Sequence, residues 1–387
     1  MNINSENYNE KLMLAFVGGG INSAVGRTHF VASQMDHLFQ LVSGCFSRKN
    51  EINIRTAIKF GLDKERVYKS IKELVNFEQN KIDALVLLTP QDQHYSDLRY
   101  CLENNIPVIC EKALVSSFEE ALNIKEILSR NNGFLKVTYN YTGYPMVREI
   151  RNKIRNGELG RILSVQIEMP QEGFIRRNAD GKPIVPQEWR LKDEVIPTIS
   201  LDLGIHLHHL MLFLTNERPV SLVANAKSYG NFKSVIDDVN ILCEHTNNVT
   251  SNIWFSKSAL GNRNGMKFRI YGSEAAIEWI QERPEIAYLY KNDGQRIILD
   301  RGDNNMDVAG DARYTRFKVG HPAGYIEAFA NYYMDLYDDI RYFKENKKLR
   351  YNEYTFGIDE SLDGLKFLEA AALSINERKW IDIDSVF

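Results

Sequence analysis

The sequence has little cysteine and no long apolar run. Its 387 residues include four cysteines, without a Cys-x-x-Cys pair: Cys45, Cys101, Cys110 and Cys243. This spacing disfavours zinc sites and disulfides and favours reduced, buried thiols in the cytosol. No segment reaches the ~20 consecutive apolar residues of a membrane-spanning helix, and residues 1–11 lack the apolar core of a signal peptide. We therefore expect a soluble cytoplasmic protein without a membrane partner.

The sequence also lacks an excess of either charge. Its 48 basic and 51 acidic residues give a formal net charge of -3, which argues against a nucleic-acid partner. With 44% apolar and 26% charged residues, the composition is that of an ordinary globular protein. At roughly 100 to 200 residues per domain, the length predicts two domains or three.

The first part of the chain alternates short apolar runs with amphipathic stretches. We expect buried strands at residues 12–17, 41–46, 84–88, 108–110 and 134–139. Between two of them, Ser116 and Ser117 precede Glu119 and Glu120, a pattern typical of a helix start. Strands that alternate with helices predict a doubly wound α/β domain with a parallel sheet, which we assign to residues 1–140.

The pattern changes after residue 140. A helix is expected at 146–156, and strand-like runs follow at 162–168, 231–244, 250–256, 267–271 and 275–280, joined by Gly and Asn turns. Long helices are expected at 324–344 and 360–376. Residues 141–387 therefore read as an α+β domain with a large, mostly antiparallel sheet.

A glycine-rich turn, Gly18-Gly19-Gly20, directly follows the first expected strand. Together with Ser23 and Gly26 it leads into a helix, an arrangement that lets the backbone approach a pyrophosphate at the helix N-terminus. The alternative is a tight turn without a ligand. The position of the turn directly after the first strand favours binding of a dinucleotide.

The second expected strand ends in Ser47-Arg48-Lys49, with no carboxylate before Glu51. An acidic residue at this strand end would bind the ribose 2′-hydroxyl of NAD, whereas a basic run suits the 2′-phosphate of NADP. The run is short, so we favour NAD and leave NADP open.

Two further strand ends carry polar residues. Thr89-Pro90 and His94 follow the third strand, and Glu111-Lys112 follow the next one. The lysine pKa falls readily on partial burial, so Lys112 is suited to share a proton with a substrate hydroxyl. The alternatives are a solvated surface lysine and a His94 that points to water.

The segment Ser200-Leu201-Asp202-Leu203-Gly204-Ile205-His206-Leu207-His208-His209 carries the strongest constellation. A spacing of four residues predicts Asp202 and His206 on one helix face, where His206 is suited to act as a general base and Asp202 to orient it or the substrate. Two alternatives are a helix N-cap at Asp202 and a metal site that includes His209. No fourth metal ligand is evident, so we predict no metal.

These motifs occur in the order of a known family. The glycine turn, Thr89-Pro90 with His94, Glu111-Lys112, Trp189-Arg190 and Asp202-x-Gly204-x-His206 resemble the Gfo/Idh/MocA family of sugar and cyclitol oxidoreductases, from about residue 12 to Trp380. Residues 139–148 and 320–329 are similar to a subgroup that oxidises the glucose unit of glycosides at C3.

The resemblance implies a Rossmann domain, a substrate domain, and hydride transfer between a secondary hydroxyl carbon and NAD(P). It makes Lys112, Asp202 and His206 the catalytic residues and suggests a homodimer or homotetramer. The implied cofactor-binding residues are Gly18, Gly19, Gly20, Asn22, Ser23, Ser47, Arg48, Thr89, Pro90, His94, Glu111, Lys112, Asn140, Trp189 and Arg190. The implied substrate-binding residues are Lys112, Tyr141, Trp189, Asp202, His206 and His321.

The expected substrate is a neutral glucoside that is oxidised at C3. Few cations accompany Lys112 and Arg190, and a sugar phosphate would need an Arg or Lys clamp. Inositol or another sugar is the alternative substrate. A sensor of the same fold that binds dinucleotide without turnover is the alternative function, although it predicts loss of the Lys, Asp and His set.

The chain departs from the family pattern in two places. The usual Glu-Lys-Pro reads Glu111-Lys112-Ala113, and a cis peptide without proline costs ~2.5–4 kcal/mol. We therefore expect Lys112 to be positioned differently. Ile21, Asn22 and Ser23 also lengthen the phosphate loop.

Overall fold

The computed structural model describes residues 10–387, which divide into two compact units. The first contains the chain up to Gly143 and also Gly324–Leu362, and the second contains Tyr144–Ala323 and Asp363–Phe387. The sequence suggested one boundary after residue 140. The later segment Gly324–Leu362 belongs to the first unit because its side chains pack into that core.

The first unit is built on a five-stranded parallel sheet of order β2-β1-β3-β4-β5. Central strand residues such as Phe16, Leu85 and Val86 are fully buried, as expected for a parallel sheet covered on both faces. All five strands were predicted, and the doubly wound fold is confirmed. The strands are β1 (Leu12–Gly18), β2 (Phe39–Cys45), β3 (Ala84–Leu88), β4 (Val108–Cys110) and β5 (Leu135–Val137).

Helices connect these strands, and local capping sets their ends. The Ser117 hydroxyl accepts from the Glu120 N–H at 3.2 Å and starts α5, as the sequence predicted, and Asn132 ends it in the left-handed conformation. The helices of the first unit are α1 (Ala24–Gln34), α2 (Asn50–Phe60), α3 (Ile71–Glu78), α4 (His94–Glu103), α5 (Phe118–Asn131) and α8 (Tyr325–Asn346).

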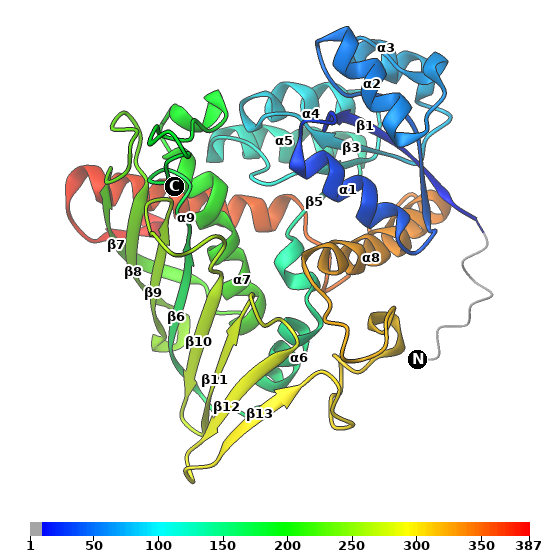
Figure 1. Cartoon of the computed structure of the whole chain (residues 1–387). Coiled ribbons are helices and arrows are strands. Elements are labelled where there is room, and N and C mark those ends of the chain that lie inside the picture. The colour runs from blue at the N-terminus through cyan, green and yellow to red at the C-terminus, as the bar shows by residue number, and fades with distance from the viewer. Residues whose placement is uncertain (1–9) are drawn as a thin grey trace. The chain divides into compact units, whose positions relative to one another are not determined.

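The long helix α8 is tied to the parallel sheet by a buried ion pair. Lys136 of β5 lies 2.9 Å from Asp339 of α8, and Thr355 donates to the same carboxylate oxygen. Burial would raise the pKa of Asp339, but Lys136 and the surrounding donors hold it below its ordinary value. Helix α8 also packs beside α1 (Figure 1).

The second unit contains a nine-stranded sheet, of order β13-β12-β11-β10-β6-β9-β8-β7-β14 in the described part of the chain. Strands β6 and β9 pair in parallel and the others pair antiparallel, so the expected mostly antiparallel sheet is confirmed. The strands are β6 (Ile162–Pro170), β7 (Pro219–Lys227), β8 (Asp238–His245), β9 (Thr250–Ser256), β10 (Lys267–Gly272), β11 (Ala275–Ile280), β12 (Ile286–Lys291), β13 (Arg296–Asp300) and β14 (Ile381–Asp382).

Several of these strands were not predicted from the sequence: β7, β12, β13 and β14. Strand β8 was expected to begin at residue 231, where the structure has a loop up to Asp237. Residues along β8 alternate strictly between buried and accessible, because one face of the sheet packs into the core and the other is open.

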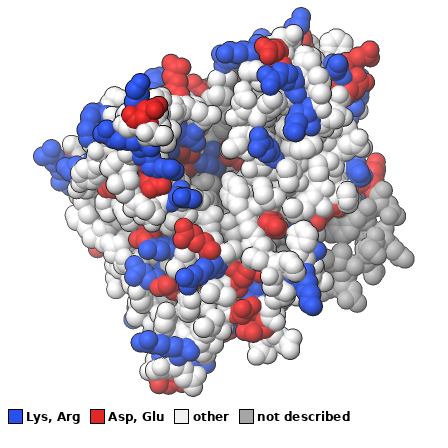
Figure 2. Space-filling view, viewed as in Figure 1, with Lys and Arg blue, Asp and Glu red and all other residues white. Residues whose placement is uncertain are grey.

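Helices α6 (Pro145–Arg155) and α7 (Ile205–Thr215) lie on one side of this sheet, as Figure 1 shows. Helix α9 (Ile358–Glu377) is the last long helix. No helix among residues 10–387 is long and apolar enough to span a membrane. Figure 2 shows Lys, Arg, Asp and Glu side chains interspersed over the face in view, in keeping with the small net charge.

The prediction of free, buried thiols is confirmed for three of the four cysteines, and Cys45 is half-buried. All four cysteines are free, and Cys101, Cys110 and Cys243 are buried. Burial raises the pKa of Cys45 to about 11 and that of Cys243 to about 12, so these thiols are protonated near neutral pH.

Histidines of the second unit form part of its core. His208 of α7 is 4% exposed, packs against the Phe367 ring with centroids 4.8 Å apart, and makes no hydrogen bond to a described residue. Burial lowers the pKa of His208 to about 3 and that of His245 to about 4. Both side chains are therefore neutral in the folded protein at neutral pH.

This burial predicts loss of stability in mild acid. As pH falls below about 6.5, the unfolded chain takes up protons that folded His208 and His245 bind only nearer pH 3 to 4. The melting temperature should therefore fall from pH 7 to pH 5, and His208→Leu should make that fall shallower. The exposed-histidine variant His321→Gln is the control and should keep the wild-type slope in calorimetry. An unchanged slope in His208→Leu would contradict this account.

Candidate functional site

The candidate cofactor site lies at one edge of the parallel sheet. Because the five strands run in the same direction, their carboxyl ends meet at one edge, which brings together the residues that follow β1 to β5. The chain places β2 on one side of β1 and β3 on the other, and ligands bind in doubly wound sheets where the order reverses in this way. The glycine turn follows β1 at that position.

Close backbone packing explains the glycines. Gly18 and Gly19 have φ angles of 80° and 68°, and a Cβ on Gly18 would lie 2.5 Å from the Leu88 carbonyl. A Cβ on Gly26 would lie 2.0 Å from the Gly19 oxygen, so α1 starts directly against the turn. The Ser23 hydroxyl accepts from the Gly26 N–H at 3.2 Å and caps this helix. The turn and the helix N-terminus thus form a cradle suited to a pyrophosphate.

Asn140 provides an independent sign of a ligand. It follows β5 and is 2% exposed, and its Nδ2 makes no hydrogen bond to a described residue. A buried amide donor without a partner is costly, so a bound molecule that accepts from it would stabilise the site. The residues at this edge therefore fit a dinucleotide, as predicted.

The end of β2 shows no acidic side chain of its own. Ser47 is partly exposed and accepts from the Lys49 N–H at 3.2 Å, while Arg48 and Lys49 are exposed. Nearby, Asn53 of α2 accepts from the Phe46 N–H at 2.7 Å and fixes the strand end. At this strand end, the exposed cations Arg48 and Lys49 are the groups that could distinguish a 2′-phosphate from a 2′-hydroxyl.

His94 holds two loops together instead of pointing to water. It is 1% exposed, and its ring nitrogens lie 2.9 Å from the Thr89 oxygen and 3.0 Å from the Ala113 oxygen. The Thr89 hydroxyl donates to Asp97 at 3.0 Å. His94 therefore fixes the segments after β3 and β4, including Pro90, and the water-facing alternative is wrong because both ring nitrogens face carbonyls inside the unit.

Glu111 ends a buried hydrogen-bonded chain that the sequence analysis missed. His29 of α1 lies 2.8 Å from the Glu111 carboxylate through Nε2 and 2.7 Å from the Tyr333 hydroxyl through Nδ1. Burial raises the pKa of Tyr333 well above its ordinary value, so its hydroxyl donates to His29, which donates to Glu111. Burial also acts to raise the pKa of Glu111, but His29, Lys112 and Thr138 hold it below its ordinary value. An ionised carboxylate thus precedes Lys112 in the chain.

Lys112 itself is partly buried at the end of β4. Its peptide bond to Ala113 is cis, although residue 113 is not proline. The expectation that Lys112 is positioned differently without proline is therefore not met at the backbone, because Ala113 adopts the cis form.

In the second unit, Asp202 lies on a π-helical turn instead of a regular α-helix. The turn covers Ser200–Gly204 and runs directly into α7, which carries His206. The N-cap alternative is wrong, because Asp202 lies inside this helical turn, whereas a face shared by Asp202 and His206 stays a prediction. Single π-helical turns are frequent at functional sites. A Cβ on Gly204 would lie 2.9 Å from the Phe255 ring, which explains the glycine of the motif.

Asp202 is held by two cations. Its Oδ2 accepts from the Nε of Arg190 at 3.2 Å and from the ammonium of Lys257, which the sequence analysis did not identify. Trp189 and Arg190 lie in the short helix Glu188–Leu191, with the guanidinium 4.2 Å from the indole ring centre. His206 is buried with 6% exposure.

The remaining predicted residues differ in environment. Tyr141 is buried in the helical turn Asn140–Gly143 of the first unit. His321 is exposed, and its Nδ1 lies 3.2 Å from the Lys318 oxygen.

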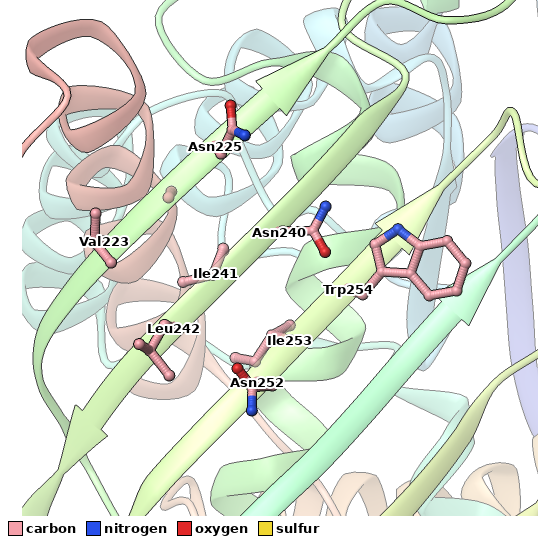
Figure 3. Close-up of a pocket in the computed structure, with 9 residues that line it drawn as sticks. Val223, Asn225, Asn240, Ile241, Leu242, Asn252, Ile253 and Trp254 are labelled. Carbon is pink, nitrogen blue, oxygen red and sulfur yellow. The ribbon is translucent and has the colours of Figure 1, made fainter.

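A separate hollow of about 250 Å³ lies on the open face of β7, β8 and β9 (Figure 3). Asn225, Asn240, Asn252 and Trp254 are among its lining residues. None of the candidate site residues lines it, so we assign it no part in the chemistry.

A doubly wound unit with a dinucleotide cradle, followed by an α+β unit with an open sheet, defines a class of NAD-binding oxidoreductases. Comparison with family models agrees with this class: the NAD-binding Rossmann fold of the oxidoreductase family matches residues 12–139, and the GFO/IDH/MocA C-terminal domain matches residues 147–278. The chain belongs to the Gfo/Idh/MocA family of oxidoreductases.

Individual relatives cover most of the chain. An uncharacterized oxidoreductase, YfiI, of Bacillus subtilis (strain 168) is 28% identical over 99% of this chain and 100% of its own length. Glucose-6-phosphate 3-dehydrogenase of the same organism is 24% identical over 64% of this chain and 69% of its own length. An inositol dehydrogenase homolog from Azotobacter vinelandii, solved with NADH and myo-inositol, is 27% identical with a TM-score of 0.87, over 97% of this chain and 98% of that chain.

The glycine packing predicts that Gly26→Ala weakens NAD binding. Its Cβ would push α1 away from the turn by colliding with the Gly19 backbone, so we expect the Kd for NAD to rise by ~10-fold or more, equivalent to ~1.4 kcal/mol. Titration calorimetry measures this, with a thermal melt to show that the variant is folded. Gly173→Ala, where a Cβ would meet nothing within 4 Å, is the control and should bind like wild type. Unchanged NAD affinity in a folded Gly26→Ala variant would contradict the cradle.

Proposed function

We propose that the protein is an NAD(P)-dependent dehydrogenase that oxidises a secondary hydroxyl of a sugar, glycoside or cyclitol. The observation that carries the proposal is the position of Lys112 at the same sheet edge as the glycine cradle, beside an ionised carboxylate, Glu111. A protein that only senses dinucleotide has no need of a proton-transferring cation there. We favour C3 of a glucoside as the site of oxidation.

The catalytic roles follow from the chemistry of three side chains. Bound NAD(P) supplies the hydride acceptor. The partly buried Lys112 ammonium stabilises the negative charge that develops on the hydroxyl oxygen, and His206 takes the hydroxyl proton as general base. Asp202, its carboxylate fixed by Arg190 and Lys257, orients the reacting groups. Alignment of these groups accounts for the protein's share of the rate.

The proposed substrate is a neutral hexoside. Trp189 and Tyr141 are its proposed aromatic contacts, because aromatic faces pack well on the C–H face of a pyranose. The name of the Bacillus glucose-6-phosphate 3-dehydrogenase supports oxidation at C3, and the myo-inositol in the Azotobacter structure supports a ring polyol. Inositol or another sugar is the alternative substrate. His321 is proposed as an additional contact from its Gly-rich loop.

The proposed assembly is a homo-oligomer. The open face of the large sheet carries Leu242 and Trp254, whose apolar surface would be covered by a second copy. We also propose that residues 1–140 form the functional dinucleotide domain and residues 141–387 the substrate domain, except that Gly324–Leu362 belongs to the first unit.

A substrate panel tests the proposed function directly. The protein should reduce NAD with a glucoside or glucose, and NMR of the product should place the ketone at C3. We expect lower kcat/KM for inositols and for glucose 6-phosphate, since a phosphate would require a clamp of cations. Preference for glucose 6-phosphate by ~10-fold or more, equivalent to ~1.4 kcal/mol, would overturn the neutral substrate. Binding of NAD without turnover of any member would favour a sensor.

Substitution of the proton-transferring groups tests the mechanism. Lys112→Ala and His206→Ala should each lower kcat by ~100-fold or more, the usual contribution of a general acid or base. His206→Ala should leave the Kd for NAD unchanged.

Two controls accompany these variants. Lys125→Ala removes an exposed ion pair of the first unit and His208→Leu removes a core histidine of α7, and both should keep near-normal kcat below their melting temperatures. His206→Ala with normal kcat but lost NAD binding would show that His206 is structural.

A further inference from the structure

Lys257 is a buried cation whose role neither the motifs nor the family resemblance assigned. It directly follows β9 and is 5% exposed. Its ammonium donates to Oδ2 of Asp202, the oxygen that also accepts from Arg190 at 3.2 Å. A buried ammonium is costly unless it is paired, and the Asp202 carboxylate supplies a negative partner for Lys257.

The main chain around Lys257 is fixed on both sides. Its N–H donates to the Asp237 carbonyl at 2.7 Å, and its own carbonyl accepts from the Phe174 N–H at 2.8 Å. The carboxylate of Asp237 is fully buried and accepts from the N–H groups of Tyr229 and Gly230 at 2.8 and 2.7 Å. The Lys257 ammonium also lies 5.2 Å from the centre of the Phe174 ring. Lys257 is thus anchored by its backbone and by an aromatic ring.

The two cations that hold Asp202 are unequal. The Arg190 side chain is 27% exposed and also donates to Gln187, whereas the Lys257 side chain is 6% exposed. Two positive donors favour the ionised form of the carboxylate and restrict its rotation. The buried and anchored partner is the one that sets the carboxylate's orientation.

We propose that Lys257 is a positioning residue that acts through Asp202. It holds the carboxylate charged and in one orientation, so that Asp202 is ready to orient the reacting groups. This proposal rests on the proposed function of Asp202. It predicts that the effect of removing Lys257 disappears when Asp202 is already neutral.

A double-mutant cycle tests the coupling without turnover. Lys257→Met removes the cation that donates to Asp202, and Asp202→Asn removes the negative charge that faces the Lys257 ammonium. Each single variant should lower the melting temperature. The decrease in the double variant should be clearly smaller than the sum of the two single decreases. Additive changes would overturn the proposal.

Kinetics with the best substrate then separate positioning from general stability. Lys257→Met should lower kcat by ~10-fold or more with the KM for NAD within ~2-fold of wild type, and should change kcat by less than ~2-fold in the Asp202→Asn background. Lys257→Arg keeps a cation and should recover part of kcat, which also covers the case in which Lys257→Met does not fold.

The matched control is Lys153→Met. Lys153 is a lysine of the same unit with 8% side-chain exposure, paired with Glu149 and Glu158, neither of which is a candidate residue. The Lys153→Met variant should have a lower melting temperature and an unchanged kcat. Equal losses of kcat in the two Lys→Met variants would overturn the proposal. A wild-type protein without turnover would refute the proposed function, whereas additive losses in the thermal cycle of an active protein would overturn only the role of Lys257.

Discussion

The approach of α1 to the turn after β1 is the constraint on which the first unit depends. The Gly26 backbone lies so close to Gly19 that no side chain fits between them. This contact aims the helix N-terminus at the sheet edge, and the parallel direction of the strands brings every other candidate of this unit to the same edge. His29 lies on the same helix, so the seating of α1 also determines where the partner of Glu111 stands.

Much of this architecture could be read from the sequence because it depends on local signals. Short apolar runs with cap residues between them predicted the five parallel strands, and the Ser117 cap marked the start of α5. Strands β7, β12 and β13 lie in the open sheet, where the accessible face mixes polar and apolar residues and the periodicity is weak. The position of α8 depended on long-range partners such as Lys136 and Asp339, which have no signature in the sequence.

The same distinction applies to the candidate site. Residues in motifs, such as Gly18 and Asp202, could be found by spacing, whereas His29, Tyr333 and Lys257 are far in sequence from the groups they contact. The π-helical form of Ser200–Gly204 also escaped prediction, because an α-helical spacing of four residues describes the same letters equally well. The close approach of Gly204 to Phe255 of β9 is likewise visible only in the structure.

Each unit supplies its own hydrogen-bond donors to one candidate carboxylate. A carboxylate near a reacting group is useful only if burial does not protonate it, and burial by itself pushes in that direction. In the first unit, His29 offsets burial at Glu111, next to Lys112 in the chain. In the second unit, Lys257 and Arg190 donate to Asp202, on the turn that leads to His206. The hydrogen-bond donors that orient each carboxylate thus lie in its own unit, so each arrangement is set by packing within that unit.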